Sequence, residues 1–226
     1  TTAAAPSLMP DALPAVTVPS FLNAGFSPPS VAGDVPPGAY EARVQGRFGL
    51  SNPRTFIVGT LGEALKKNGN NSLENAQEIP LETTVNGRTE NQAADFYKFT
   101  VKKGQRVLVE CATRDLDSRA AGALMLLSPE GRELERARLT GWLDHTAAAD
   151  GTLIVKVHDF VYRGGDQYFY RLTITSGPRI DFVFPPAVEP GQTAKVTVFG
   201  RNLPGGSPAK VSVDGKALEQ LVVNVA

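Results

Sequence analysis

The sequence predicts an all-β protein, and three observations predict it. Apolar segments of strand length recur along the chain, several of them alternating apolar and polar residues. Turn-forming residues, among them 22 glycines and 17 prolines, separate these segments at intervals of about 8 to 12 residues, as in sandwiches and barrels. No stretch shows the alternation of strands with long helices that a parallel βαβ sheet requires.

The charge balance and the cysteine content exclude several functional classes. The chain has 23 basic and 23 acidic residues and thus no formal net charge, whereas a nucleic-acid binder needs a basic surface. No apolar run approaches the roughly 20 residues that span a bilayer. We therefore expect no nucleic-acid partner and no membrane insertion. Cys111 is the only cysteine, which excludes an intrachain disulfide and a Cys-based zinc site.

The first 60 residues divide into a linker and a pair of strands. Residues 1–20 are rich in Pro and Ala and predict an extended linker. Residues 21–60 predict two strands around a Gly-rich bend, with Tyr40, Ala42 and Val44 on one face. So short a segment buries little apolar surface alone. We therefore expect residues 21–60 to be part of a β-sandwich whose other strands lie elsewhere; through residues 49–58 they resemble the closing strands of an Ig-like module.

A connector is expected at residues 61–69. Leu61, Ala64 and Leu65 have helical spacing and predict one helical turn there. The Asn-Gly-Asn sequence at 68–70 ends that turn with residues that tolerate left-handed backbone.

Residues 70–176 show the clearest strand pattern. The segment 95–101 directs Tyr97, Phe99 and Val101 to one face, and the segment 106–112 does the same with alternate residues that include Cys111. Further strands are expected in this block and in residues 177–226, at 123–127, 153–157, 168–174, 180–184, 194–199, 210–213 and 221–225.

An ordered series of short motifs runs through this block: Asn70-Asn71-Ser72, Val85-Asn86-Gly87, Asp95-Phe96-Tyr97-Lys98-Phe99, Lys103-Gly104-Gln105, Pro129-Glu130-Gly131-Arg132, Asp150-Gly151 and Tyr170-Arg171-Leu172. With this series, residues 70–176 resemble the bacterial pre-peptidase C-terminal (PPC) domain. The resemblance implies a jelly-roll-like antiparallel β-sandwich that is not itself catalytic. It also implies attachment to a secreted peptidase or another extracellular protein.

The segments on either side are similar to Ig-like modules. Residues 177–226, with Pro190-Gly191 and Gly200-Arg201-Asn202-Leu203, resemble the opening of an IPT/TIG module, and residues 49–58 look like closing strands of a comparable one. The expected fold is thus a PPC-like sandwich with flanking Ig-like β-sandwich segments. Two arrangements remain open: two truncated modules, or one split sandwich into which the PPC-like domain is inserted.

The PPC resemblance also implies where calcium would bind, namely at acidic residues before Asn70 and at an Asp-x-Asp pair. In this chain Lys66 and Lys67 lie before Asn70, and Asp95 is the only acid at the position of the Asp-x-Asp pair. The positive charges of the lysines would repel a bound cation. A second acidic bend contains Asp115 and Asp117, which suit turn chemistry. We predict no metal and no cofactor, with Asp95, Asp115 and Asp117 as weak calcium candidates.

Residues with catalytic chemistry are few and scattered. Ser128 lies in an ordinary turn without a nucleophile-elbow pattern, and Cys111 has the phase of a buried, inert thiol. The other groups considered are the pair His158–Asp159, His145 beside Asp144, and Ser118. We predict that the chain has no catalytic residues and is not an enzyme.

The segment 160–168 combines aromatic side chains, a guanidinium and glycines, a composition typical of recognition surfaces. It provides the binding candidates Tyr162, Arg163, Asp166 and Tyr168. The alternative is a plain hairpin, with its tyrosines on the sandwich and Arg163 paired to Asp166. Trp142 is either a core residue or a second exposed aromatic.

These features predict a non-catalytic module of a secreted or cell-surface multidomain protein, located outside the cell, on its surface or in the periplasm. It would act as a spacer, an adhesion domain or a partner-binding domain. Its partners would be neighbouring domains, other surface proteins or an extracellular polymer. The alternative is an accessory domain that targets an extracellular peptidase or other hydrolase to its substrate. Tightly packed flanking modules would favour a structural role, and an exposed aromatic strip would favour polymer binding.

Overall fold

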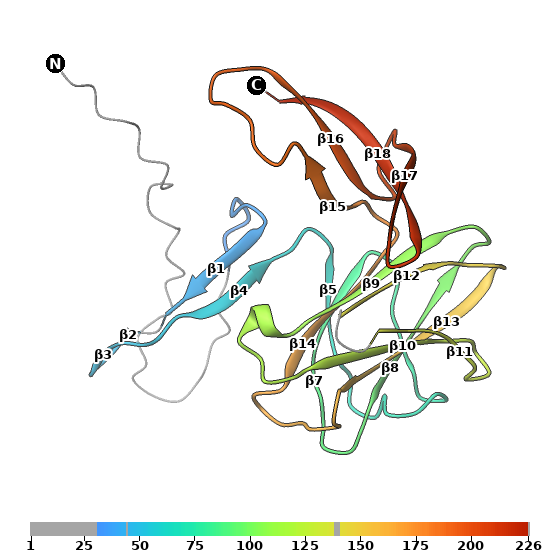
Figure 1. Cartoon of the computed structure of the whole chain (residues 1–226). Coiled ribbons are helices and arrows are strands. Elements are labelled where there is room, and N and C mark those ends of the chain that lie inside the picture. The colour runs from blue at the N-terminus through green and yellow to red at the C-terminus, as the bar shows by residue number, and fades with distance from the viewer. Residues whose placement is uncertain (1–30, 44, 138–140, 226) are drawn as a thin grey trace.

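A computed structural model describes residues 31–43, 45–137 and 141–225, and these residues form five β-sheets (Figure 1). The central pair of five-stranded sheets makes a sandwich. A two-stranded hairpin with a small two-stranded extension precedes it, and a four-stranded sheet follows it. The structure is therefore all-β, as predicted.

The N-terminal hairpin pairs β1 (Gly38–Ala42) with β4 (Arg54–Val58), and β2 (Gln45–Gly46) with β3 (Gly49–Leu50) at its tip. Tyr40 and Ala42 are half-buried and lie on one face, as predicted. Val44, the linker predicted for residues 1–20, and residues 21–30 lie outside the described residues.

The sandwich has the strand orders β11-β10-β13-β8-β6 and β12-β9-β14-β7-β5. All neighbouring strands are antiparallel except for β5–β7 and β6–β8, in which short edge strands run parallel to their partners. The bounds are β5 (Gly62–Leu65), β6 (Gln77–Glu78), β7 (Thr83–Arg88), β8 (Asp95–Val101), β9 (Arg106–Ala112), β10 (Gly122–Leu127), β11 (Glu133–Ala137), β12 (Trp142–Thr146), β13 (Gly151–Asp159) and β14 (Phe169–Thr175).

The core lies between these two sheets and follows the predicted alternation. Tyr97, Phe99 and Val101 of β8 are buried against the inward residues of β9, which include Cys111. Leu172 of β14 is fully buried in the same cluster. Side chains at every second position of each strand thus fill the space between the sheets.

The helical turn predicted at residues 61–69 is wrong, because this segment holds β5. The Gly62 N–H donates to Glu82 O at 3.3 Å and the Lys66 N–H donates to Asn86 O at 2.9 Å, so β5 extends a sheet of the sandwich. Leu65 is 75% exposed while Ala64 packs on the core, which is the alternation of a strand. Four residues gain little from helix formation, and pairing with β7 determines their conformation.

The chain enters and leaves the sandwich at the same end of the same sheet. Gly62 at the start of β5 and Ile174 near the end of β14 are both registered with Thr83 of β7. Two strand spacings, about 10 Å, therefore separate the points at which the flanking segments depart. Figure 1 shows both flanking sheets emerging from this end.

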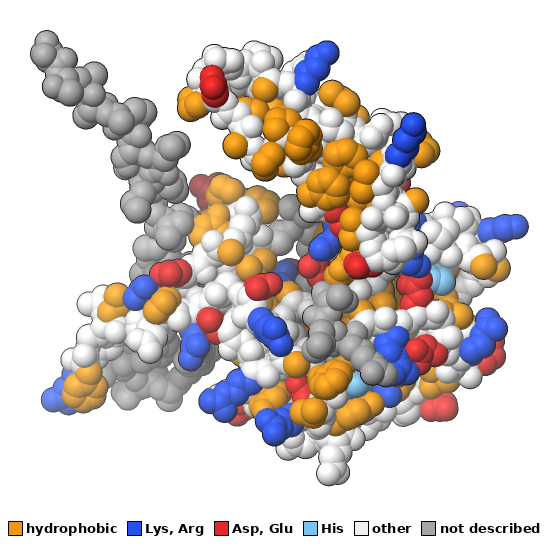
Figure 2. All heavy atoms as spheres, viewed as in Figure 1, with side chains coloured by type: hydrophobic (Ala, Val, Ile, Leu, Met, Phe, Trp, Pro, Cys, Tyr) orange, Lys and Arg blue, Asp and Glu red, His pale blue; other side chains and the backbone are white. Residues whose placement is uncertain are grey.

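The C-terminal sheet has the order β15-β16-β18-β17, formed by β15 (Arg179–Phe184), β16 (Ala194–Arg201), β17 (Ser207–Val213) and β18 (Lys216–Val225). All four strands were predicted with shorter bounds. Phe182 stacks on Phe199 at 4.7 Å, and Phe184 and Val222 are exposed. Figure 2 shows apolar side chains gathered on this sheet.

Helical structure is confined to one 3-10 turn, η1 (Arg114–Leu116), in the part of the chain that the structure describes. No helix there is long and apolar enough to cross a membrane.

The buried position of Leu172 gives a direct test of the core. We expect Leu172→Ala to lower the free energy of unfolding by about 2–5 kcal/mol, because it removes buried methyl groups and leaves a cavity. Leu65→Ala, at an exposed position, is the matched control and should change it by less than about 0.5 kcal/mol. Urea denaturation of both variants measures the difference, and equal effects would contradict the assigned core.

Candidate binding groove

A chain of buried polar side chains crosses the sandwich. Lys66 Nζ lies 2.7 Å from Asp95 Oδ1, the Tyr170 hydroxyl donates to Asp95 Oδ2 at 2.6 Å, and the Tyr97 and Tyr170 hydroxyl oxygens are 2.6 Å apart. Tyr97 and Tyr170 belong to opposite sheets. This chain therefore links the two layers through their core.

Burial controls the ionisation of these hydrogen-bonded side chains. It raises the pKa of the Asp95 carboxyl, although contacts with Lys66 and Tyr170 oppose it. Burial also raises the pKa of the Tyr97 and Tyr170 hydroxyls far enough that both stay neutral. Gly87 makes room for the Tyr170 ring, because a Cβ at this position would lie 2.4 Å from a ring carbon.

The weak calcium candidates have other partners or stand apart. Besides Asp95, the Lys66 ammonium contacts Arg88 O at 2.9 Å and Glu90 Oε1 at 3.0 Å, so it occupies the oxygen-lined position beside Asp95. Asp117 accepts a hydrogen bond from the Thr55 N–H at 3.1 Å, and Asp115 is exposed. Among the described residues, no three His, Cys, Asp or Glu side chains form a group that could hold a metal ion.

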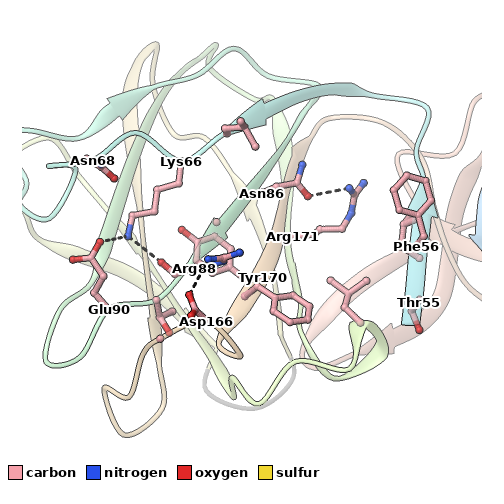
Figure 3. A pocket seen from close by; sticks show the side chains of 17 residues that line it. Thr55, Phe56, Lys66, Asn68, Asn86, Arg88, Glu90, Asp166, Tyr170 and Arg171 are labelled. Carbon is pink, nitrogen blue, oxygen red and sulfur yellow. Dashed lines mark hydrogen bonds and ion pairs between the residues drawn. The ribbon is translucent and has the colours of Figure 1, made fainter. Parts of the chain in front are cut away.

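Beside Lys66 lies a groove of about 680 Å³ on the outer face of the sheet that contains β5, β7 and β14. Strand β4 of the hairpin forms one wall. Figure 3 shows Lys66, Asn68 and Glu90 at one end, Thr55 and Phe56 at the other, and Asn86 and Arg171 between them. The groove is thus built from segments that are distant in sequence.

The floor of the groove is polar and its charges are paired. Arg171 binds Glu63 through two contacts, at 2.7 and 3.2 Å, and donates to Asn86 Oδ1 at 3.0 Å. Arg88 lies 3.0 Å from Asp166. Apart from Asp166, which precedes β14 in a loop, these side chains project from the solvent-facing positions of β5, β7 and β14, which alternate with the core positions.

The wall of the groove is apolar. Phe56 and Ile57 of β4, Leu116 of η1 and Phe169 of β14 all line it. A second hollow of about 520 Å³ shares Thr55, Leu116 and Phe169 with the groove and continues it past the hairpin.

The predicted binding segment 160–168 divides between two surfaces. Asp166 reaches the groove and pairs with Arg88, in place of the Arg163 partner that the plain-hairpin alternative assigned to it. Tyr162 stacks on His158 at 4.2 Å and is 39% exposed. Arg163 is exposed and Tyr168 is half-buried, and of the four candidates only Asp166 lines the groove.

The groups considered for catalysis have structural contacts. The Asp159 carboxylate accepts backbone N–H groups of Ala121, Val161 and Arg163 at 2.8–3.1 Å, whereas His158 Nδ1 contacts the Asp159 backbone oxygen at 2.8 Å. Asp159 therefore holds a turn and does not orient the imidazole. Burial raises the pKa of the Cys111 thiol to about 12, which suppresses the reactive thiolate.

The remaining groups are similarly occupied. The Ser128 hydroxyl donates to Glu130 at 2.7 Å and the Ser118 hydroxyl donates to the Gln167 backbone oxygen at 3.3 Å. His145 Nδ1 lies 3.7 Å from Glu135. Among the described residues, none of these candidate nucleophiles is paired with a base.

Trp142 fits neither predicted role, because it lies between two arginines of the C-terminal segment. The Arg201 and Arg179 guanidinium carbons are 4.3 and 4.9 Å from its ring centroid. Arg201 has no exposed surface and donates to Asp144 Oδ2 at 2.6 Å and to Asp181. Trp142 and Asp144 belong to the sandwich and Arg201 to the next sheet, so these contacts join the two.

Arg106 completes this ion-pair cluster, donating to both Asp144 oxygens at 2.7 and 2.6 Å. Burial opposes the charge on Asp144, but the hydrogen bonds from Arg106 and Arg201 prevail and lower the pKa of its carboxyl. The Asn202 side chain donates to Ser176 O at 2.9 Å and to Arg106 O at 3.2 Å. We call Arg106, Trp142, Asp144, Arg201 and Asn202 the latch.

The sequence motif Gly200-Arg201-Asn202-Leu203 contains two latch residues, but only its family resemblance marked it. Nothing in the spacing of Arg106 or Asp144 indicates that they would meet Arg201. The latch is thus the principal feature that sequence reasoning missed.

Comparison with known proteins finds similar solved structures but no matching sequence family. No protein-family model and no curated protein matches the sequence. The pre-peptidase C-terminal domain of collagenase from Bacillus anthracis is similar in structure, with 16% sequence identity, a TM-score of 0.37, and coverage of 44% of this chain and 94% of that domain. It belongs to the family that residues 70–176 resemble in sequence.

A second similar structure is PliG, a periplasmic inhibitor of g-type lysozyme from Aeromonas hydrophila. It has 12% identity and a TM-score of 0.36, and the match covers 50% of this chain and 98% of that one. The Ig-like assignment of the flanking segments stays a prediction.

The Lys66–Asp95 contact can be tested by a double-mutant cycle. We expect Lys66→Met to lower the free energy of unfolding by about 3–5 kcal/mol, because it leaves a buried carboxylate without its cation. Adding Asp95→Asn should recover most of this loss, since the remaining amide is neutral. Equilibrium unfolding of the two single variants and the double variant gives the coupling; additive losses would contradict the pairing.

Burial of His158 predicts a pH dependence of stability. Burial lowers its pKa, aided by nearby Lys156 and Arg136 and opposed by contacts with Asp159. The unfolded chain then binds this proton more readily than the folded chain, so stability falls as the pH drops below about 6.5 and is fully present above it.

We expect His158→Phe, which keeps a ring against Tyr162, to show a shallower decline of unfolding free energy between neutral and mildly acidic pH. Denaturation at a series of pH values measures it. A decline as steep as that of the unaltered chain would assign the dependence to other groups.

Proposed function

We propose that this chain is a non-catalytic module of a secreted or cell-surface multidomain protein, and that it acts as a spacer holding neighbouring β-modules at a fixed angle. The latch carries this proposal. It fixes the C-terminal sheet to the sandwich through a buried arginine that two carboxylates and an indole ring surround.

Such a contact favours one geometry over all others. A charge that has left water is stable only while its hydrogen bonds and ion pairs are complete. If the two parts rotated against each other, Arg201 would lose Asp144 while both remained partly buried. The surrounding contacts Arg179–Glu110, at 3.0 Å, and Lys216–Glu135 add further constraints at the same junction.

The absence of a paired nucleophile and base among the described residues supports a non-catalytic role, and the PPC resemblance supports a location outside the cytoplasm. The second candidate function is that of an accessory domain targeting an extracellular hydrolase to its substrate. The groove beside β4 favours this second candidate, because a pure spacer needs no concave surface.

Distance measurements between the two parts test the spacer role. One spin label is attached at Lys103→Cys in the sandwich and the other at Lys210→Cys in the C-terminal sheet, both exposed positions. The native thiol of Cys111 is buried, so the label reacts with the two introduced cysteines. We expect one narrow distance distribution. We expect Arg201→Met to broaden it and to lower the unfolding free energy by about 3–5 kcal/mol, since Asp181 loses its arginine partner and Asp144 keeps only Arg106.

Arg88→Met is the matched control, because this arginine has an exposed ion pair and exposed pairs contribute at most about 1 kcal/mol. A broad distribution in the unaltered chain would overturn the spacer role. Turnover of peptide or glycan substrates by the isolated chain would overturn the non-catalytic role.

A further inference from the structure

We propose that the groove between β4 and the outer face of the sandwich binds a neutral oligosaccharide. This inference adds a ligand class to the spacer role and does not depend on the latch, which lies at the other junction. It is argued from the charges, the hydrogen-bonding groups and the shape of the groove.

The charges argue for a ligand without net charge. Each cation that lines the groove already has a carboxylate partner: Lys66 has Asp95 and Glu90, Arg88 has Asp166, and Arg171 has Glu63. These pairs leave no uncompensated positive charge among the residues that line the groove, so an acidic ligand would gain no net Coulombic attraction there. A neutral ligand leaves every pair intact.

The same floor still offers many hydrogen bonds. A carboxylate has about four acceptor sites and a guanidinium has five N–H donors, so the exposed Arg88–Asp166 pair retains unused donors and acceptors around its single contact. Asn68 is exposed at the end of the groove. A ligand rich in hydroxyl groups can donate to and accept from these side chains in turn.

The apolar wall of the groove fits the C–H faces of a sugar ring. Phe56 and Phe169 are half-buried and line the groove together with Leu116, and aromatic rings bury apolar area at low entropic cost. Pyranose rings have C–H faces that pack on such side chains while their equatorial hydroxyls reach polar groups at the edge. Figure 3 shows polar side chains at the Lys66 end and in the middle of the groove and Phe56 at its other end, so one groove offers both kinds of surface.

The length of the groove suits a glycan chain. The groove of about 680 Å³ lies within the range of small-ligand sites and continues into the hollow of about 520 Å³, so it can hold several linked units. On β4 the Thr55 N–H is already bonded to Asp117, which removes one donor that a peptide could use to add as a strand.

Two-dimensional ¹H–¹⁵N NMR titration tests the proposal with the full chain. The probes are cellohexaose, xylohexaose, mannohexaose and chitohexaose, with hexagalacturonate as an acidic glycan and a polyproline decamer as an extended peptide. We expect at least one neutral hexasaccharide to shift amides of Phe56, Asn86, Arg88 and Phe169. We expect neither hexagalacturonate nor the peptide to shift them.

Variants assign the binding to named side chains. Phe56→Ala and Arg88→Ala should each weaken the affinity about tenfold, as the loss of an aromatic contact or a charged hydrogen bond does. Tyr162→Ala and Arg163→Ala, at residues that do not line the groove, are the matched controls and should stay within about twofold. Thermal unfolding of all four variants confirms that they fold.

Several results would overturn the proposal: no amide shift with any neutral hexasaccharide at millimolar concentration, binding of only the acidic glycan or the peptide, or shifts centred on Tyr162. Arg201→Met separates the two proposals, because it loosens the latch and should leave glycan affinity unchanged.

Discussion

The hydrogen-bonded chain from Lys66 through Asp95 and Tyr170 to Tyr97 is the interaction on which the rest of this structure depends. It joins the two sheets at their centre, and it fixes the segment by which the chain enters the sandwich. A buried polar network rigidifies a protein only when every member is satisfied. Here the lysine at one end provides the charge that the buried carboxylate needs.

That network also shapes the outer surface. Lys66 lies at one end of the groove, and Tyr170 occupies the space that Gly87 leaves open in the floor. The groove is therefore anchored to the core and not only to surface side chains. Its opposite wall belongs to the hairpin, which contacts the sandwich through η1 and Asp117, so the width of the groove depends on how that hairpin sits.

The sequence was sufficient to predict the all-β class and most strands, because alternation of period two reports directly on burial in a sheet. The strands β8 and β9 have the predicted bounds. Strand β5 was missed, since four residues with helical spacing carry less information than the parallel pairing that orders them. The edge strands β11 and β12 were missed as well, because they are short and partly polar.

The groove and the latch could not be predicted in the same way. Asn86 and Arg171 were recognised only as parts of family-like motifs, and Arg201 is separated from Asp144 by 57 residues. Charged side chains in a sequence indicate surface, so a fully buried arginine contradicts the usual expectation. Its partners are side chains of β12 and β15 and the Val213 backbone oxygen at the end of β17, and only the packing of two sheets against each other brings them together.

The polypeptide enters and leaves the sandwich at one end of one sheet, and this placement determines how the sandwich responds to mechanical tension. A pull on the two flanking segments acts on β5 and β14, with only β7 between them. Because both strands are gripped at the same end, the force peels their hydrogen bonds apart one after another and does not shear the whole ladder at once. The latch and the contact between Lys66 and Asp95 must break before this ladder is loaded, because they tie the C-terminal sheet and the entry segment to other strands of the sandwich. The sandwich therefore holds its flanking segments in place at low tension, and it opens from one end of one sheet once those polar contacts are lost.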